Sequence, residues 1–246
     1  MGTSLRIALR RLLSCIVCAM AASGAGAGSL GVSPIRVDLS AAAPTAAVTL
    51  ENTGTTPMVV QLQAMRWSAV DHQDHYDATQ ELLVTPPIVT ILPGRSQVVR
   101  LGIVGTLPTG REDAYRMFIE EVPPPPQAGN QTLQVSLRIG VPVFVQPPQS
   151  VHPALRWILI ENGGVPALEV RNDGDAHSRL FDVKVRTDGT AGEVSVTSVG
   201  LGYLLPGQAR VLALPSQPVR TGGGPLVVSA RTEHGPSGGE LAWPAR

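Results

Sequence analysis

Cysteine is nearly absent from this chain of 246 residues, and both cysteines, Cys15 and Cys18, lie close to its start. Residues 1–27 have the layout of a secretory signal peptide: arginines, then an apolar run from Leu12 to Ala22, then small residues before an expected mature start at Gly28. The run is shorter than the roughly 20 residues that a membrane-spanning helix needs. The exported chain would therefore lack cysteine, which excludes a disulfide-held fold.

Lysine is also scarce, because Lys184 is the only one in the chain. Arginine and lysine together number 19, as do aspartate and glutamate, and three of the arginines fall in the predicted signal. The mature chain would thus carry a net charge near −3 with histidine neutral. This slightly acidic charge balance does not indicate nucleic acid as a partner.

Aromatic residues are few, and no long stretch shows helical periodicity. The chain instead has 22 prolines and 26 glycines between short runs of valine, leucine, isoleucine and threonine. Such runs, alternating with polar residues and bounded by turn signals, predict an all-β fold.

A weak internal repeat indicates two related domains. Val48–Gly54 resembles Leu168–Gly174, since each is a strand that ends in an Asn-x-Gly turn. A Leu-Pro-Gly turn follows in each half, at Leu92–Gly94 and at Leu205–Gly207.

The repeat and the chain length predict two immunoglobulin-like sandwiches of about 100 residues each. The prolines Pro147 and Pro148 interrupt strand pairing, so we place the domains at residues 28–147 and 148–246.

The segment Thr132–Val145 alternates for longer than one sandwich normally needs, since strands average about 5–6 residues. Two interpretations are open. The segment is either one long strand through the whole sandwich, or an edge strand whose apolar face extends past the core to accept another strand. One face carries Leu133, Val135, Leu137, Ile139, Val141, Val143 and Val145.

The order of motifs in the first half resembles that of the periplasmic chaperones of chaperone–usher pilus systems. The second half resembles them through Asn172–Gly174 and Gly202–Gly207. The motifs of the first half are Val32–Val37, Leu50–Gly54, Pro93–Leu101, Tyr115–Pro123 and Leu133–Val145.

The resemblance implies an L-shaped pair of immunoglobulin-like domains in the periplasm, with no catalytic activity, cofactor or metal. Its implied partners are pilin subunits and an outer-membrane usher. In this family the chaperone lends a strand to a subunit that lacks one, and Leu133, Val135 and Leu137 match the donor residues. Self-association of the free protein through this strand is a further expectation.

The family also binds the terminal carboxylate of the subunit with two cations, and Arg36 matches the first. Pro142 stands where the second, a lysine, is expected. Arg138 is the candidate replacement, because it shares the strand face of Pro142, although it lies about 13 Å away at ~3.3 Å per residue.

Arg100 and Glu121 match family positions that contribute to a charged contact between the domains, with Glu233 as the candidate partner from the second domain. Their alternative interpretation is as ordinary exposed charges that contribute about 0–1 kcal/mol per pair.

Three other interpretations have weaker support. The histidines and carboxylates of Asp71–Tyr76 allow a metal site, but strand alternation would separate them. Gly235–Gly239 matches the Gly-x-Ser-x-Gly nucleophile motif around Ser237, but no helix can follow so close to the chain end. A two-domain structural component of a pilus or adhesion system is the main alternative to a chaperone.

Overall fold

The computed structural model describes residues 30–70, 72–123, 136–187, 194–196, 202–214 and 225–242. The predicted signal, residues 1–27, lies outside these ranges. The described residues form strands, turns and loops, as the all-β prediction required. Within them, no helix is long and apolar enough to cross a bilayer.

The first sandwich packs two sheets face to face. One sheet has the strand order β1-β3-β8-β6, and the other has the order β2-β10-β9-β4-β5, with β7 also pairing with β4. The strands are β1 (Leu30–Ser33), β2 (Val37–Leu39), β3 (Thr45–Asn52), β4 (Met58–Val70), β5 (Gln73–Ala78), β6 (Leu82–Thr85), β7 (Ile88–Ile91), β8 (Ser96–Ile103), β9 (Asp113–Glu121) and β10 (Arg138–Val145).

Alternation along each strand builds the core of this sandwich. In β3 the side chains of Val48 and Leu50 are buried, and their neighbours on either side point outward. They meet the inward residues of the second sheet, such as Met117 and Ile119 of β9. A period of two therefore gives each sheet one apolar face, and the two faces close on each other.

The second sandwich has the same plan. Its sheets have the orders β11-β12-β16 and β14-β13-β17-β18, with β15 also pairing with β13. The strands are β11 (Leu155–Asn162), β12 (Val165–Asn172), β13 (Ser178–Thr187), β14 (Val194–Ser195), β15 (Tyr203–Leu204), β16 (Ala209–Ala213), β17 (Leu226–Thr232) and β18 (Gly235–Leu241).

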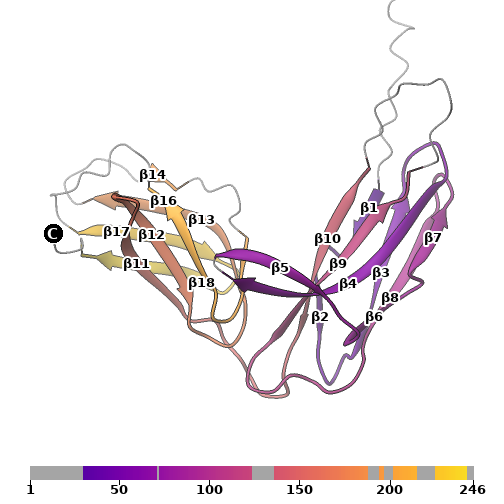
Figure 1. The fold of residues 1–246 in the computed structure, drawn as a ribbon, viewed down its shortest axis with the longest axis horizontal. Coiled ribbons are helices and arrows are strands. Elements are labelled where there is room, and N and C mark those ends of the chain that lie inside the picture. The colour runs from indigo at the N-terminus through magenta and orange to yellow at the C-terminus, as the bar shows by residue number, and fades with distance from the viewer. Residues whose placement is uncertain are drawn as a thin grey trace, which may run out of the picture.

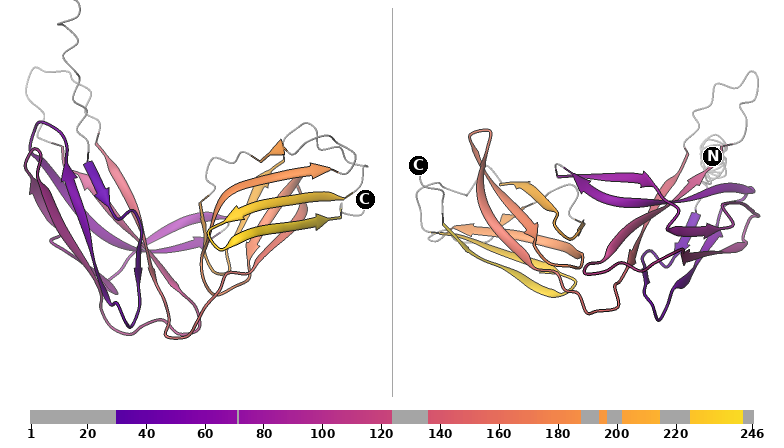
Figure 2. Two further views of the ribbon diagram at one scale, coloured as in Figure 1. Left: turned by 180° about the vertical axis from the view of Figure 1, so that it is seen from behind. Right: turned by 60° about the horizontal axis from the view of Figure 1, so that its bottom comes forward.

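The two sandwiches meet at an angle, so the molecule is L-shaped (Figure 1). The hairpin of β4 and β5 extends from the first domain along the second (Figure 2). Near its tip, His72 Nδ1 lies 3.0 Å from the carbonyl oxygen of Ala209 in β16. The strands of the two domains end at Val145 and resume at Leu155, on either side of the predicted junction.

The internal repeat corresponds to one structural device used twice. The buried Asn52 side chain donates hydrogen bonds to the carbonyl oxygens of Thr56 and Ile91, and the backbone carbonyl of Asn52 accepts from the N–H of Gly94. Asn52 Oδ1 also accepts from the N–H of Gly54.

Asn172 does the same in the second domain, where its side-chain amide donates to the carbonyls of Ala176 and Leu204 and its backbone carbonyl accepts from the N–H of Gly207. Gly207, like Gly94, has a positive φ, here 76°, which favours glycine. Each buried asparagine thus joins the Asn-x-Gly turn to the Leu-Pro-Gly turn that the sequence repeats.

We predict that Asn172→Ala destabilises the second domain by about 2–4 kcal/mol, because two buried carbonyls lose their donor. Calorimetry of the purified protein should show one transition moving to lower temperature while the other stays. Asp173→Ala, an exposed change at the next position, is the matched control and should leave both transitions in place. Equal shifts for the two variants would contradict the role of Asn172.

Candidate functional site

Strand β10 has a partner along only part of one edge. On one side it pairs with β9 from Arg138 to Val145, whereas on the other side β2 covers only Val143–Val145. Among the described residues, no strand pairs with the outer edge of β10 between Arg138 and Pro142. The sandwich thus presents an open strand edge.

The outward backbone groups of this edge follow from the pairing with β9. The N–H of Glu121 donates to the carbonyl of Leu137, so odd-numbered residues of β10 direct their backbone groups toward β9 and even-numbered ones away. Arg138 and Gly140 therefore turn both N–H and C=O outward. Pro142 turns only a C=O outward, and its missing N–H costs no hydrogen bond with β9.

The apolar face of β10 becomes more exposed toward its start. Val143 and Val141 are buried in the core, Ile139 is partly buried against it, and Leu137 is 36% exposed. The predicted extension of the apolar face beyond the core therefore begins at Leu137. Leu133 and Val135 lie outside the described residues.

Within the described residues, strand β10 begins at Arg138, and Ser136 and Leu137 lie outside it. Residues 132–135 of the expected strand lie outside the described residues, so the predicted start at Thr132 stays a prediction. Ser136 Oγ still donates to the carbonyl of Glu121.

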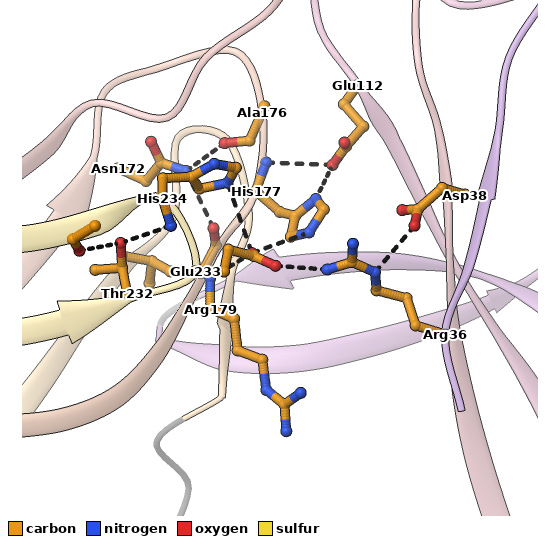
Figure 3. A network of polar contacts seen from close by, with 12 residues as sticks. Arg36, Asp38, Glu112, Asn172, Ala176, His177, Arg179, Thr232, Glu233 and His234 are labelled. Carbon is orange, nitrogen blue, oxygen red and sulfur yellow. Dashed lines mark hydrogen bonds and ion pairs between the residues drawn. The ribbon is translucent and has the colours of Figure 1, made fainter. Parts of the chain in front are cut away.

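The corner between the domains is held by a carboxylate, that of Glu233, in the turn between β17 and β18. One of its oxygens accepts from Nη1 of Arg36 at 2.5 Å. The other accepts from the N–H of Arg179 and lies 3.2 Å from Nε2 of His177 (Figure 3). Arg36 also donates from Nε to Asp38.

His177 extends the network back to the first domain. Its Nδ1 lies 2.7 Å from Oε1 of Glu112, which also accepts from the N–H of His177. Burial by itself would lower the pKa of His177, but Glu112 and Glu233 outweigh it and raise the pKa to about 9. The imidazole is therefore charged at neutral pH.

The pKa of Glu233 moves in the opposite direction. Burial would raise it, but the hydrogen bonds and charges of His177 and Arg36 bring it down to about 2. The corner is thus a partly buried chain of alternating charges, Arg36, Glu233, His177 and Glu112, that crosses between the domains twice.

Aromatic side chains surround this network and connect it to β10. The ring of Phe144 stacks on His177 at 3.5 Å and 8° and is fully buried. It belongs to what we call the junction cluster, which spans the two domains and consists of the buried Trp67, Ala114, Phe144 and Leu205 with the partly buried Tyr76 and Tyr203 packed against them. The end of β10 opposite to Leu137 is therefore fixed between the domains.

The structure places the predicted contact residues in different locations. Arg36 and Glu233 meet at the corner, so Glu233 is more than an exposed charge. Glu121 lies at the end of β9 remote from Glu112, and no side-chain polar contact within the described residues joins Arg100 or Glu121 to the second domain. The expected network through Arg100 and Glu121 is replaced by one through Arg36.

Arg138 is engaged elsewhere. Its Nε lies 2.7 Å from Oε1 of Glu120, directly across on β9, and its guanidinium covers the ring of Phe118 at 4.0 Å. The side chain is exposed and stays four residues from Pro142.

Sequence reasoning missed Glu112, His177 and Phe144. Glu112 and His177 are 65 residues apart, and nothing local marks either as part of a site. A sequence signal existed only for Phe144, an aromatic residue on the face of β10 opposite to the core-facing Val143 and Val145.

The structure bears on two motifs with weaker support in the sequence, the metal-site candidate Asp71–Tyr76 and the nucleophile motif around Ser237. Among the described residues, no group of three histidine, cysteine, aspartate or glutamate side chains could hold a metal ion; Asp71 lies outside them. Ser237 is in strand β18, and its hydroxyl accepts a hydrogen bond from Nε1 of Trp157. That strand hairpin differs from the strand-turn-helix that a nucleophile motif needs.

Comparison with known proteins gives consistent matches. Residues 29–150 match the family described as "Pili and flagellar-assembly chaperone, PapD N-terminal domain". The chain is 30% identical to the probable fimbrial chaperone YadV of Escherichia coli over 172 residues, which are 64% of this chain and 68% of YadV. It is 29% identical to the chaperone protein FimB/FhaD of Bordetella pertussis over 199 residues, 74% of this chain and 80% of the relative.

Solved structures show the same fold. A chain of the CsuC–CsuE chaperone–tip adhesion subunit pre-assembly complex of Acinetobacter baumannii superposes with a TM-score of 0.66 at 21% identity, covering 87% of this chain and 98% of that one. The YadV chaperone superposes with a TM-score of 0.61 at 20% identity, covering 86% and 96%.

We predict that the contribution of His177 to stability depends on pH. Because its folded pKa is raised, that contribution, on the order of 3 kcal/mol, is fully present below about pH 6.5 and is lost as pH rises through about 9. The melting temperature of wild type should exceed that of His177→Gln most near pH 6 and by much less at pH 10. A difference that stays constant over this range would contradict a charged His177.

Proposed function

This chain belongs to the pilus-assembly chaperone family, and we propose that it captures pilin subunits on the open edge of β10 and in the adjoining cleft between its domains. The chain is a chaperone of pilus assembly, which removes the alternative of a structural pilus component.

The single observation that carries the proposal is the outer edge of β10. Backbone groups of Arg138, Gly140 and Pro142 point outward without a strand partner among the described residues, beside an apolar face that continues outward through the exposed Leu137. An open, apolar edge is an aggregation hazard unless it receives a strand. A subunit segment that pairs here would gain backbone hydrogen bonds and would bury apolar side chains at roughly 25 cal/mol per Å².

Leu133 and Val135 would continue this face as donor residues, as the resemblance implies. A subunit that lacks a strand would bind them in its open core. Backbone pairing depends little on side-chain identity, which suits a chaperone that serves several subunits.

Arg36 is positioned to bind the terminal carboxylate of the subunit. Nε donates to Asp38 and Nη1 to Glu233, while Nη2 has no hydrogen-bond partner among the described residues. A carboxylate could accept from Nη2 without displacing either contact. A guanidinium can serve three acceptors because its five N–H groups point in fixed directions.

Delivery to an outer-membrane usher and export to the periplasm are part of the same proposal. The relatives are fimbrial chaperones, and the predicted signal of residues 1–27 and the boundaries 28–147 and 148–246 fit an exported two-domain protein. Self-association through the β10 edge would cover it when no subunit is bound.

We predict that Leu137→Asp lowers the amount of subunit that co-purifies from the periplasm by about tenfold or more, because a charge would enter the apolar core of the subunit. Val165→Asp, at a residue 62% exposed in the second domain, adds the same charge away from the edge. It should capture as wild type does. Undiminished capture by Leu137→Asp would count against strand addition at this edge.

Arg36→Ala should also reduce capture. The reduction could come from loss of the carboxylate contact or from loss of the corner contact between the domains. Glu233→Gln distinguishes them, because it weakens the contact between the domains and keeps the guanidinium. We predict a larger loss of capture, by about tenfold, for Arg36→Ala than for Glu233→Gln in the same co-purification. Equal losses would assign Arg36 to the corner alone.

A further inference from the structure

Strand β13 of the second domain carries an exposed aromatic side chain, Phe181, beside a cation, Arg179. We propose that these two side chains form a second contact surface for the captured pilin subunit. The surface would receive the folded body of the subunit, not its chain end. This inference rests on the proposed function and adds a wall of the second domain to the surfaces that hold the subunit.

A β-bulge turns Phe181 outward. Leu180 and Asp182 pair with adjacent residues of β17, so Phe181 is an extra residue in β13. Leu180 and Val183 are buried, and the bulge places two residues between them on the outside, where regular alternation would place one. Bulges of this kind re-aim a side chain and recur beside functional sites. Phe181 is accordingly 48% exposed.

The guanidinium of Arg179 is held between two rings. It lies 5.2 Å from the ring centroid of Phe181 and 5.4 Å from that of Tyr203. The backbone N–H of Arg179 donates to Glu233, but the side chain extends away from that carboxylate (Figure 3). Among the described residues, no carboxylate forms an ion pair with this guanidinium. The rings therefore fix a cation whose donors are available to another molecule.

Tyr203 connects this surface to the first domain. Its ring lies 5.1 Å from that of Phe144, centroid to centroid. Phe144 shares a face of β10 with Gly140, because residues at even spacing along a strand point to the same side. Toward Gly140 this face runs away from the junction, and β13 also runs away from it toward Phe181. The two surfaces thus diverge from one aromatic contact and form the two sides of the angle between the domains (Figure 1).

A subunit paired with the open edge of β10 would lie within this angle, so its folded body is the occupant that the surface fits. Aromatic and arginine side chains carry much of the binding energy of protein interfaces. Phe181 offers apolar area, and Arg179 offers N–H donors beside it. The pair therefore suits an apolar side chain of the subunit that has carbonyl or carboxylate oxygens next to it.

Photo-cross-linking at position 181 tests which molecule lies on this surface. A benzophenone-bearing phenylalanine analogue replaces Phe181, or Leu137 at the open edge as the positive control. Val165, which is 62% exposed at the start of β12, is the negative control. Cells are irradiated, and the proteins cross-linked to the chaperone are identified by mass spectrometry. We expect the same subunit from positions 181 and 137 and none from position 165.

Cross-links from position 181 only to the usher, only to a second chaperone, or to no protein would overturn the inference. The proposed function would stand as long as position 137 still reaches the subunit. If neither position reaches a subunit, the proposed function fails together with this inference.

A second experiment measures what the surface contributes to capture. We expect Phe181→Ser to lower the amount of co-purified subunit by about fivefold or more, Arg179→Gln by about threefold, and Val165→Ser not at all. Arg179→Gln keeps the backbone N–H that donates to Glu233, so the corner between the domains should keep its contacts. Equal melting temperatures of the variants and wild type would verify this. Undiminished capture by Phe181→Ser would overturn the inference.

Discussion

The angle between the two domains depends on a carboxylate held between cations. Glu233 of the second domain contacts both Arg36 of the first domain and His177 of the second. His177 in turn contacts Glu112 of the first domain. Removing charged groups from water is costly, so such a chain is stable only when each charge has its partner in place. Movement of one domain would separate these ion pairs, and it would also break the aromatic stack of Phe144 on His177.

This corner also explains how β10 can be fixed at one end and open at the other. Phe144 is buried between the domains, and β2 pairs with the last three residues of the strand. Toward Arg138 no strand in the described part of the chain pairs with the outer edge, and the apolar face extends beyond the core. Arg36, which directly precedes β2, lies at this transition.

Much of the fold was readable from sequence, because alternation and turn residues are local signals. The repeated Asn-x-Gly and Leu-Pro-Gly turns predicted two related sandwiches, and Asn52 and Asn172 show why these residues recur. The identity of the charged partners was not readable, because Glu112 and His177 meet only when the domains dock.

Hydrogen exchange at single amides of β10 tests the central claim most directly. In the free protein the amides of Ile139 and Val141 face β9 and should exchange slowly, whereas those of Arg138 and Gly140 face outward and should exchange fast. Binding of the subunit should protect Arg138 and Gly140 and change Ile139 and Val141 little. If both outward amides exchange as fast in the complex as in the free protein, the subunit binds elsewhere and β10 is not the strand that receives it.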